Sequence, residues 1–473
     1  KEYRRQRQMC IRDRIYRKQK NMEEELSDVE RWQKSEDERL EYEGYCNKIR
    51  KGLEDLDEKS GERALWELVQ NARDTSSEAR IKVELNDTNI IFSHHGKPFD
   101  YTSFRALVKQ DSSKDRNGAD QVGQYGTGFM TTHAFNRLVY VSGPFVVKTG
   151  EETIKGYVQV KDFELDRTLV DTAEGPKKMK EQLEKVKQLW KGELLQEIND
   201  DATSFRYDLT PSQVRNVSDQ LSSAIHLMPF VLVINSRIKE VEICNHYTKE
   251  HFTLRKSEQQ SIIPLEKKGW HVVTEKVLLI NHATEEDSAP FTCKSLQSDN
   301  GDVVVIPPFP NFCGLPVDIP SLFLWFPLLG TERFGVNFIF HSKRFYPVEK
   351  RNNIMLPGST PIKQENGNKN SVVLKEITEV LFAYFAKDEN AKTLIRQMCE
   401  VSFPNTSEDK VTCQFYKDMQ ELWNTHIPYW KILPINDEYY AITDARVKLL
   451  HRDFYSKLNL EQRLEYEPIL TYY

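Results

Sequence analysis

A carboxylate, an amide and a second carboxylate recur at helical spacing near residue 70. They are Glu67, Asn71 and Asp74, in a segment of good helix formers that no proline interrupts. At roughly 100° per residue, the three side chains share one face of a helix. An amide oxygen can bind a hard cation such as Mg²⁺, and a carboxylate one turn away can deprotonate a water molecule. The spacing indicates magnesium-assisted hydrolysis or, as the ordinary alternative, the solvated face of an amphipathic helix.

A glycine-rich turn follows about fifty residues later. It reads Gly123-Gln-Tyr-Gly126-Thr-Gly128-Phe129, and glycines of this kind let a backbone approach phosphates closely at the start of a helix. A dinucleotide site requires a strand before such a turn, whereas residues 111–120 are polar. The Gly-Lys-Ser/Thr ending of a P-loop is also missing. Between helix and turn lies His94-His95-Gly96, so the three segments together suggest a split nucleotide pocket.

The order and gaps of these motifs resemble the GHKL (Bergerat-fold) ATPase superfamily. Glu-Leu-Val-Gln-Asn-Ala-Arg-Asp and Gly-Gln-Tyr-Gly-Thr-Gly-Phe are most similar to its heat shock protein 90-like and sacsin-type branch. The motif match covers residues 60–143 and extends more weakly to Thr203 and to residues 320–352. The resemblance implies ATP and Mg²⁺ as ligands, ATP hydrolysis, and an N-terminal α/β sandwich of the Bergerat type.

The resemblance also implies a role for individual residues. Glu67 matches the general base that activates water, Asn71 the magnesium ligand, and Asp74 an acid near the nucleotide. Thr203 matches a threonine near the adenine, and residues 107–122, with Lys114, match a mobile lid. The remaining implied nucleotide contacts lie in or after the glycine turn: Gly123, Gln124, Tyr125, Gly126, Thr127, Gly128 and Phe129.

One position departs from the family pattern. The family usually has Asp-x-Gly at its second motif, with the Asp bound to the adenine amino group, but here His94 precedes Gly96 at that spacing. A neutral imidazole nitrogen accepts one hydrogen bond if its tautomer is suitable. Three alternatives stay open: His94 contacts the base, one of the two histidines is simply a surface turn residue, or the chain is a degenerate, non-hydrolysing nucleotide binder.

A basic pair further along suggests a second catalytic group. Lys350 and Arg351 end a segment, from Gly335 onward, that is similar to the middle domain of this superfamily. A guanidinium can meet two phosphate oxygens at once. We therefore expect Arg351, with Lys350 as the fallback, to reach the γ-phosphate. The alternative is a solvated turn.

The pattern along the 473 residues predicts an α+β protein. Residues 1–14 read as a non-native leader and are excluded from fold reasoning. The expected parts are a GHKL ATP-binding domain at 15–230, a β-rich middle domain at 231–361, a linker at 358–370, and a helical region at 371–473. Residues 22–57 read as an exposed helix, and Pro211 is expected to open a helix that ends near Met228.

Composition limits the partners and the compartment. Lys and Arg number 66 against 72 Asp and Glu, so a net charge of −6 provides no general attraction to nucleic acid. Seven dispersed cysteines without a Cys-x-x-Cys pair favour a reducing, cytoplasmic setting and argue against a zinc site. Without an uninterrupted run of about 18 apolar residues, no membrane span is expected.

Two functional classes fit these observations. The first is a chaperone- or sacsin-like ATP-driven clamp that closes its lid and dimerises on nucleotide binding, acting on an unknown client. The second is a nucleic-acid-associated clamp, like the MutL and MORC branches, with a phage-defence role as one possibility by analogy. The net charge and the residue sequence of the glycine motif favour the first class, the chaperone- or sacsin-like clamp.

Overall fold

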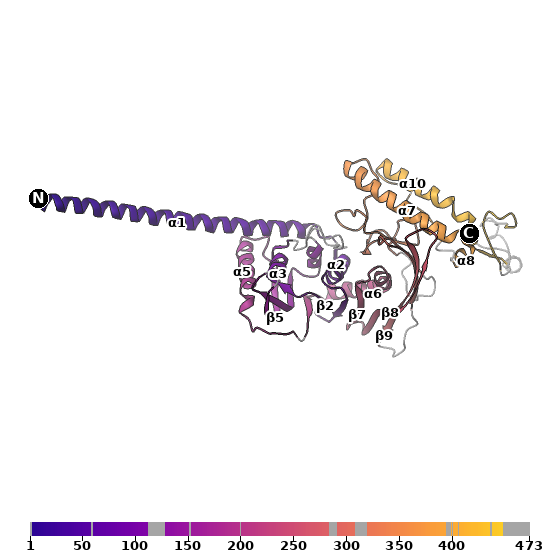
Figure 1. Cartoon of the computed structure of the whole chain (residues 1–473), viewed down its shortest axis with the longest axis horizontal. Helices are drawn as coiled ribbons and strands as arrows, with labels where there is room; N and C mark the ends of the chain where they lie inside the picture. Colours follow the sequence, from indigo (N-terminus) through magenta and orange to yellow (C-terminus); the bar gives the residue numbers. More distant parts are fainter. Residues whose placement is uncertain are drawn as a thin grey trace. The chain divides into compact units, whose positions relative to one another are not determined.

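The computed structural model describes most of the chain as two compact units (Figure 1). Residues 1, 58–59, 112–127, 151–152, 199, 283–290, 308–318, 394–398, 400, 405, 436–437 and 448–473 lie outside the described part, as do the side chains of residues 1–26. The first unit comprises Lys1–Glu67 and Lys97–Asp208, and the second comprises Leu68–Gly96 and Leu209–Tyr473.

The first unit is a small sheet with helices. Its helices are α1 (Glu2–Glu54), the first half of α2 (Ser60–Thr75), α3 (Tyr101–Lys109), α4 (Gly128–Thr131), η1 (Thr132–Ala134), α5 (Gly175–Gln188) and η2 (Leu189–Lys191). Its strands are β3 (Phe99–Asp100), β4 (Leu138–Lys148), β5 (Ile154–Asp166) and β6 (Ala202–Asp208). β4 pairs with all three other strands, antiparallel to β5 and β6 and parallel to β3.

Strand β4 contains a local irregularity. It runs through Gly143-Pro144 with a register shift between Val141 and Gly143. Gly143 has φ +148°, and a β-carbon there would lie 3.0 Å from the Cα of Thr203 on β6. A strand tolerates glycine and proline at such an irregularity, where ladder hydrogen bonds are already interrupted.

Helix α1 confirms the expected N-terminal helix and is longer than residues 22–57. Its last turns pack into the first unit through Tyr42, Cys46, Ile49 and Leu53, which are buried. Earlier turns carry Trp32 exposed to solvent. The prediction of an exposed helix therefore holds for the middle of α1 and fails for its end.

The second unit is built on a long mixed sheet. Its strands are β1 (Ala79–Leu85), β2 (Asn89–His95), β7 (Ile238–Asn245), β8 (Glu250–Pro264), β9 (Trp270–Asn281), β10 (Phe291–Ser298), β11 (Val303–Ile306), β12 (Leu322–Leu324), β13 (Phe326–Pro327) and β14 (Ile339–His341). The strand order is β13-β12-β14-β11-β10-β9-β8-β7-β1-β2. β1 and β7 run parallel in register, and both neighbouring pairs, β1–β2 and β7–β8, are antiparallel.

This pairing affects the expected domain segments. β1 lies inside the segment 15–230 and β7 inside the segment 231–361, yet they are neighbours in one sheet. The compact units are therefore discontinuous in sequence, whereas the expected segments are continuous. Compactness and functional domains are different properties, so the three-segment division stays a prediction.

One long helix forms part of the core of the second unit. α6 (Pro211–Ile234) begins after Thr210, which caps it together with Gln213. The helix continues through Pro229, six residues beyond the expected end near Met228. By length and composition α6 could cross a bilayer, but 72% of its apolar window is buried inside the protein. Because the apolar side chains pack on strands of the sheet, such as Phe230 on Phe291, α6 acts as a core helix.

Two further helices, α7 (Asn368–Phe385) and α10 (Lys410–Asn424), lie side by side against the sheet (Figure 1). They share a buried cluster with Phe340 of β14 and with Phe338 just before that strand. The unit also contains η3 (Lys363–Gly367), α8 (Asp388–Ala391), η4 (Ile427–Tyr429), and the hairpin of β15 (Leu433–Ile435) and β16 (Glu438–Tyr440).

The expected linker at 358–370 is wrong from residue 361 onward. Residues 361–367 are helical, with a π-helical stretch at Lys363–Gly367, and α7 starts directly afterwards. Gly367 has no room for a side chain, because a β-carbon would lie 2.4 Å from the carbonyl of Leu356. Close backbone packing, and not chain flexibility, explains a glycine here.

Candidate functional site

Helix α2 carries the three polar residues that the spacing singled out. Its apolar residues, including Leu65, Leu68 and Ala72, are buried, whereas Glu67 and Asn71 are partly exposed one turn apart. The expected helix at 60–76 is thus confirmed with its two faces. Glu67 ends the first of the two segments that form the first unit, and Asn71 belongs to the second unit.

In the first unit, Glu67 meets the end of the glycine motif. Gly128 opens α4, and a β-carbon at this position would lie 2.1 Å from Oε2 of Glu67. Any other residue at position 128 would displace that carboxylate. The described structure therefore brings together two residues, 61 positions apart, that the sequence placed in one pocket.

The next residue, Phe129, belongs to the core of the first unit. Phe129 is buried, with its ring 5.3 Å from Phe205 of β6 and 5.9 Å from His133. Thr203 is buried on the same strand, two residues before Phe205, and lies against Gly143 of β4. Burial lowers the pKa of His133 to about 3, so its ring is neutral in the folded protein.

The rest of the glycine motif falls outside the described residues. This applies to Gly123, Gln124, Tyr125, Gly126 and Thr127, and to Lys114 in the expected lid. The start of that lid is described, and α1 holds it. Lys48 of α1 pairs with Asp111 at 2.5 Å, and Lys109 contacts Glu41 at 3.2 Å and Tyr45.

In the second unit, Asp74 is bound to its own neighbour. Its side chain is fully buried and receives a 3.0 Å ion pair from Nη1 of Arg73. The guanidinium of Arg73 lies 4.0 Å from the ring centre of Trp325, a residue in the left-handed region with φ 67°. A buried ion pair under an aromatic ring is held firmly in place, so α2 is tied to the segment between β12 and β13.

The second motif packs against the end of α2. A β-carbon on Gly96 would lie 3.0 Å from Oγ1 of Thr75 and 3.2 Å from the carbonyl oxygen of the same residue. His94 is buried on the same face of β2 as Ile90 and Phe92, whereas His95 is exposed. The structure thus separates the two histidines: His94 lies on the buried face and His95 faces solvent. A contact of His94 with the base stays a prediction.

Arg351 contacts α2 directly within the second unit. Its Nη1 donates to Oε1 of Gln70 at 3.3 Å, one residue before Asn71 in the chain. Arg351 occupies the left-handed region with φ 50°, where a residue with a β-carbon is strained by about 1–2 kcal/mol. Strain of this kind is often retained at functional positions.

A buried amide holds the loop that carries Arg351. Asn370 of α7 is fully buried, and its Nδ2 donates to the carbonyl oxygens of Tyr346 and Met355 at 2.9 and 2.8 Å. Its Oδ1 accepts from the backbone N–H of Tyr346 at 2.9 Å. Both ends of the 346–355 loop are therefore fixed by one side chain. We define this arrangement of Asn370 and residues 346–355 as the Asn370 bracket.

Sequence reasoning missed Arg73, Trp325 and Asn370. Arg73 falls off the polar face of α2, and no spacing signal links it to Trp325 more than 250 residues later. Asn370 lies in a run rich in Gly and Asn that resembled a linker. The only available signal was the apolar periodicity of residues 371–385, which begins directly after Asn370.

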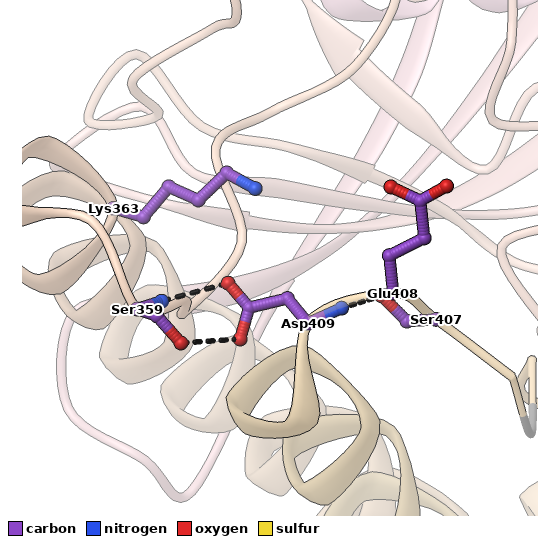
Figure 2. A pocket seen from close by; sticks show the side chains of 5 residues that line it. All are labelled: Ser359, Lys363, Ser407, Glu408 and Asp409. Carbon is purple, nitrogen blue, oxygen red and sulfur yellow. Dashed lines mark hydrogen bonds between the residues drawn. The ribbon is translucent and has the colours of Figure 1, made fainter.

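A further pocket in the second unit contains none of the expected site residues. Its volume is about 480 Å³, and it is lined by Ser359, Lys363, Ser407, Glu408 and Asp409 (Figure 2). Asp409 accepts from the N–H and the Oγ of Ser359 at 2.7 and 2.9 Å and caps α10 through the N–H of Val411. The carboxylate is thus used to join two segments, and the pocket is an open surface depression.

Comparison with known proteins adds little to this geometry. No protein-family model matches the sequence, and no curated protein matches it. Among solved structures, the chain is similar to the crystal structure of the B subunit of the DNA gyrase from Myxococcus xanthus, with 7% identity and a TM-score of 0.27. The match covers 67% of this chain and 89% of that one. A likeness this weak carries no functional argument.

Proposed function

We propose that this chain is an ATPase of the GHKL type, with α2 as its catalytic helix. The observation that carries the proposal is the contact between Glu67 and Gly128, since it joins the candidate base to the phosphate-binding turn. The absence of a β-carbon at Gly128 leaves the Glu67 carboxylate at the point where a phosphate-binding backbone would begin. The glycine motif and the Asn71 amide fit ATP and Mg²⁺ as ligands.

In this proposal each residue has one task. Glu67 orients a water molecule and takes its proton as the water attacks the γ-phosphorus. Asn71, one helical turn away, provides an amide oxygen for the cation. When bound, Mg²⁺ would offset part of the negative charge on the phosphate oxygens. Thr203 and His94 are assigned to contacts with the adenine. Asp74, paired with Arg73, is assigned as the acidic residue of the pocket near the base.

Arg351 is assigned to the charge on the γ-phosphate. Its contact with Gln70 supports this role, because it brings the guanidinium to α2 beside Asn71. A guanidinium stabilises the negative charge on phosphoryl oxygens, and this contribution is larger in the transition state than in the ground state. Lys350 remains the fallback for the same role.

We further propose slow turnover coupled to lid closure and dimer clamping, in a cytoplasmic, chaperone- or sacsin-like protein acting on an unidentified client. The contacts of α1 with Lys109 and Asp111 support a lid that an N-terminal helix controls. A net charge of −6 favours this class over a nucleic-acid clamp. DNA binding with a steep dependence on salt would reverse that preference.

The decisive experiment is Glu67→Ala, with Glu62→Ala on the exposed face of the same helix as the matched control. We expect Glu67→Ala to lower the ATP hydrolysis rate by about 10²–10⁴-fold with little change in ATP affinity, because a general base acts mainly in the transition state. Asn71→Ala should instead weaken magnesium-dependent ATP binding. Hydrolysis by Glu67→Ala at the wild-type rate would refute the assignment.

A further inference from the structure

A row of polar side chains crosses three adjacent strands of the second unit. In the sheet register, Glu84 of β1 lies beside Cys244 of β7, and Cys244 lies beside His251 of β8. Glu242 precedes Cys244 by two residues and therefore shares its face. Val241 and Ile243, which alternate with them, are buried on the opposite face. The sheet thus gathers a carboxylate, a thiol and an imidazole at one place.

Three of these groups already have the spacing of metal ligands. Nε2 of His251 lies 2.9 Å from Oε1 of Glu242, and Sγ of Cys244 lies 3.3 Å from the same oxygen. All three ligand atoms lie within 4.8 Å of one another. Bonds of about 2.0–2.3 Å at tetrahedral angles separate ligand atoms by roughly 3.3–3.5 Å. The two distances to Oε1 of Glu242 are thus close to the separation that a shared ion requires.

We propose that Glu242, Cys244 and His251 bind a borderline-soft divalent cation of the Zn²⁺ class, with the fourth coordination position open to water. Imidazole, thiolate and carboxylate are the ligands that Zn²⁺ takes in proteins, and three protein ligands leave one position free. Cys244 is buried, whereas Glu242 and His251 are partly exposed, so the open position faces solvent. This inference is independent of the proposed ATPase function.

The surrounding charges match a dication. Lys82 of β1 lies 3.1 Å from Glu84 and 3.7 Å from Glu242, so two carboxylates face one ammonium. When the metal–sulfur bond forms, the Cys244 thiol releases its proton to solvent. The net charge of the four groups around the ion, the Lys82 ammonium, the two carboxylates and the thiolate, is then −2. Without metal, burial and then the neighbouring Glu242 raise the pKa of Cys244 to about 12, so the thiol is protonated.

A second histidine supports the ring of His251. His282, just after β9, stacks on it with ring centres 4.1 Å apart, and its Nε2 is hydrogen-bonded to Oγ1 of Thr253 at 2.8 Å. His282 is thereby engaged and is assigned to positioning, not to ligation. The absence of a Cys-x-x-Cys pair argued against zinc in the sequence, but this triad is assembled across strands, where linear spacing gives no signal.

The test uses Co²⁺ as a spectroscopic probe on the full chain freed of metal by a chelator. Tetrahedral cobalt bound to a thiolate gives visible d–d absorption and a thiolate-to-metal charge-transfer band in the near ultraviolet. We expect both bands to saturate at one equivalent and to be displaced by Zn²⁺. Absence of the charge-transfer band would overturn the proposal.

Variants locate the site. Cys244→Ser should abolish the charge-transfer band, and His251→Gln should weaken Zn²⁺ binding by about 100-fold or more. The matched control is Cys413→Ser, which removes a partly exposed thiol elsewhere in the same unit. Loss of the band in Cys413→Ser but not in Cys244→Ser would place the metal elsewhere and refute the assignment. Circular dichroism without metal checks that each variant folds.

Lys82→Met provides a test that disruption of the fold cannot mimic. Removing the ammonium beside Glu242 should tighten Zn²⁺ binding by about tenfold, whereas a merely destabilised sheet would bind more weakly. Weaker or unchanged binding in Lys82→Met contradicts the charge argument. ATP hydrolysis by Cys244→Ser is expected to equal that of wild type, so failure of the metal site and failure of the ATPase proposal are distinguishable.

Discussion

At the scale of single residues, a substitution at Gly128 tests the proposed role of Glu67 separately from folding. A β-carbon at Gly128 would meet Oε2 of Glu67 at 2.1 Å, and this oxygen is the end of a flexible side chain. We expect Gly128→Ala to move the carboxylate at little cost in stability. Hydrolysis should then fall by about 10²-fold or more, because a general base must reach its water within hydrogen-bond distance.

The measurement for this variant pairs a steady-state ATPase assay with a thermal melt. Gly44→Ala in α1 is the control, because a β-carbon there has no atom within 4 Å. It should leave both quantities unchanged or raise the melting temperature slightly, since alanine is the better helix former. Wild-type activity in Gly128→Ala would show that Glu67 is not the general base.

Residue patterns predicted part of the site and missed the part that depends on burial. Glu67 and Asn71 follow from helical spacing, which one sequence contains. The Arg73–Trp325 contact does not, because it joins residues of distant segments through a buried guanidinium. His94 was identified by its place in a motif, but only the strand register reveals that it is buried and His95 exposed.

At the scale of elements, the Asn370 bracket links α7 to the loop that carries Arg351. Its three hydrogen bonds come from a fully buried amide. Asn370→Ala removes the partner of the Tyr346 N–H and of the Met355 carbonyl oxygen, whereas the Tyr346 carbonyl oxygen still accepts from the N–H of Met355. Each lost hydrogen bond costs about 0.5–1.5 kcal/mol. We expect the loop to loosen and hydrolysis to fall toward the rate of Arg351→Ala.

Amide hydrogen exchange over residues 346–355, together with ATPase rates, checks this expectation. Asn368→Ala, on the exposed side of the same helix two residues earlier, is the control. Exchange in the loop should accelerate only in Asn370→Ala. If hydrolysis stays at the wild-type rate while exchange accelerates, the loop is structural and Arg351 has no role in turnover.

Elements with strong periodicity were predictable, and elements set by long-range packing were not. α2 agrees with its sequence pattern, and α10 lies in the region 371–473 that was expected to be helical. The start of α7 was read as a linker because Gly367 and its Asn-rich neighbours are weak helix formers. Packing against Leu356 overrides that preference.

At the scale of the whole molecule, buried histidines make stability depend on pH. Burial lowers the pKa of His341 to about 4, and the backbone N–H of Trp325 donates to its Nδ1 at 3.1 Å. An unfolded histidine titrates near 6.5, so between these values the unfolded state binds more protons. The stability from His341 is fully present above about pH 6.5 and is lost as the pH falls toward 4.

Thermal or urea unfolding at pH 7 and pH 5 checks this sign. His341 should account for about 2 kcal/mol of the stability lost over that interval. His341→Asn retains an acceptor but cannot titrate there, so its loss should be smaller by about that amount. His246→Asn, at an exposed position, is the control. An equal pH response in His341→Asn and wild type would show that the ring is already solvated in the folded state.

The parallel pairing of β1 with β7 also limits where the chain can be truncated without exposing an edge of the sheet. A shortened protein ending near residue 230 would retain β1 but lack β7, so backbone groups of β1 that face β7, such as the carbonyl of Leu85, would be unsatisfied on an exposed edge. Ile81, Val83 and Leu85 are apolar, so that edge resembles a template for intermolecular strand addition. A soluble shortened form therefore has to extend past Asn245, and preferably past β8, which protects β7 in turn.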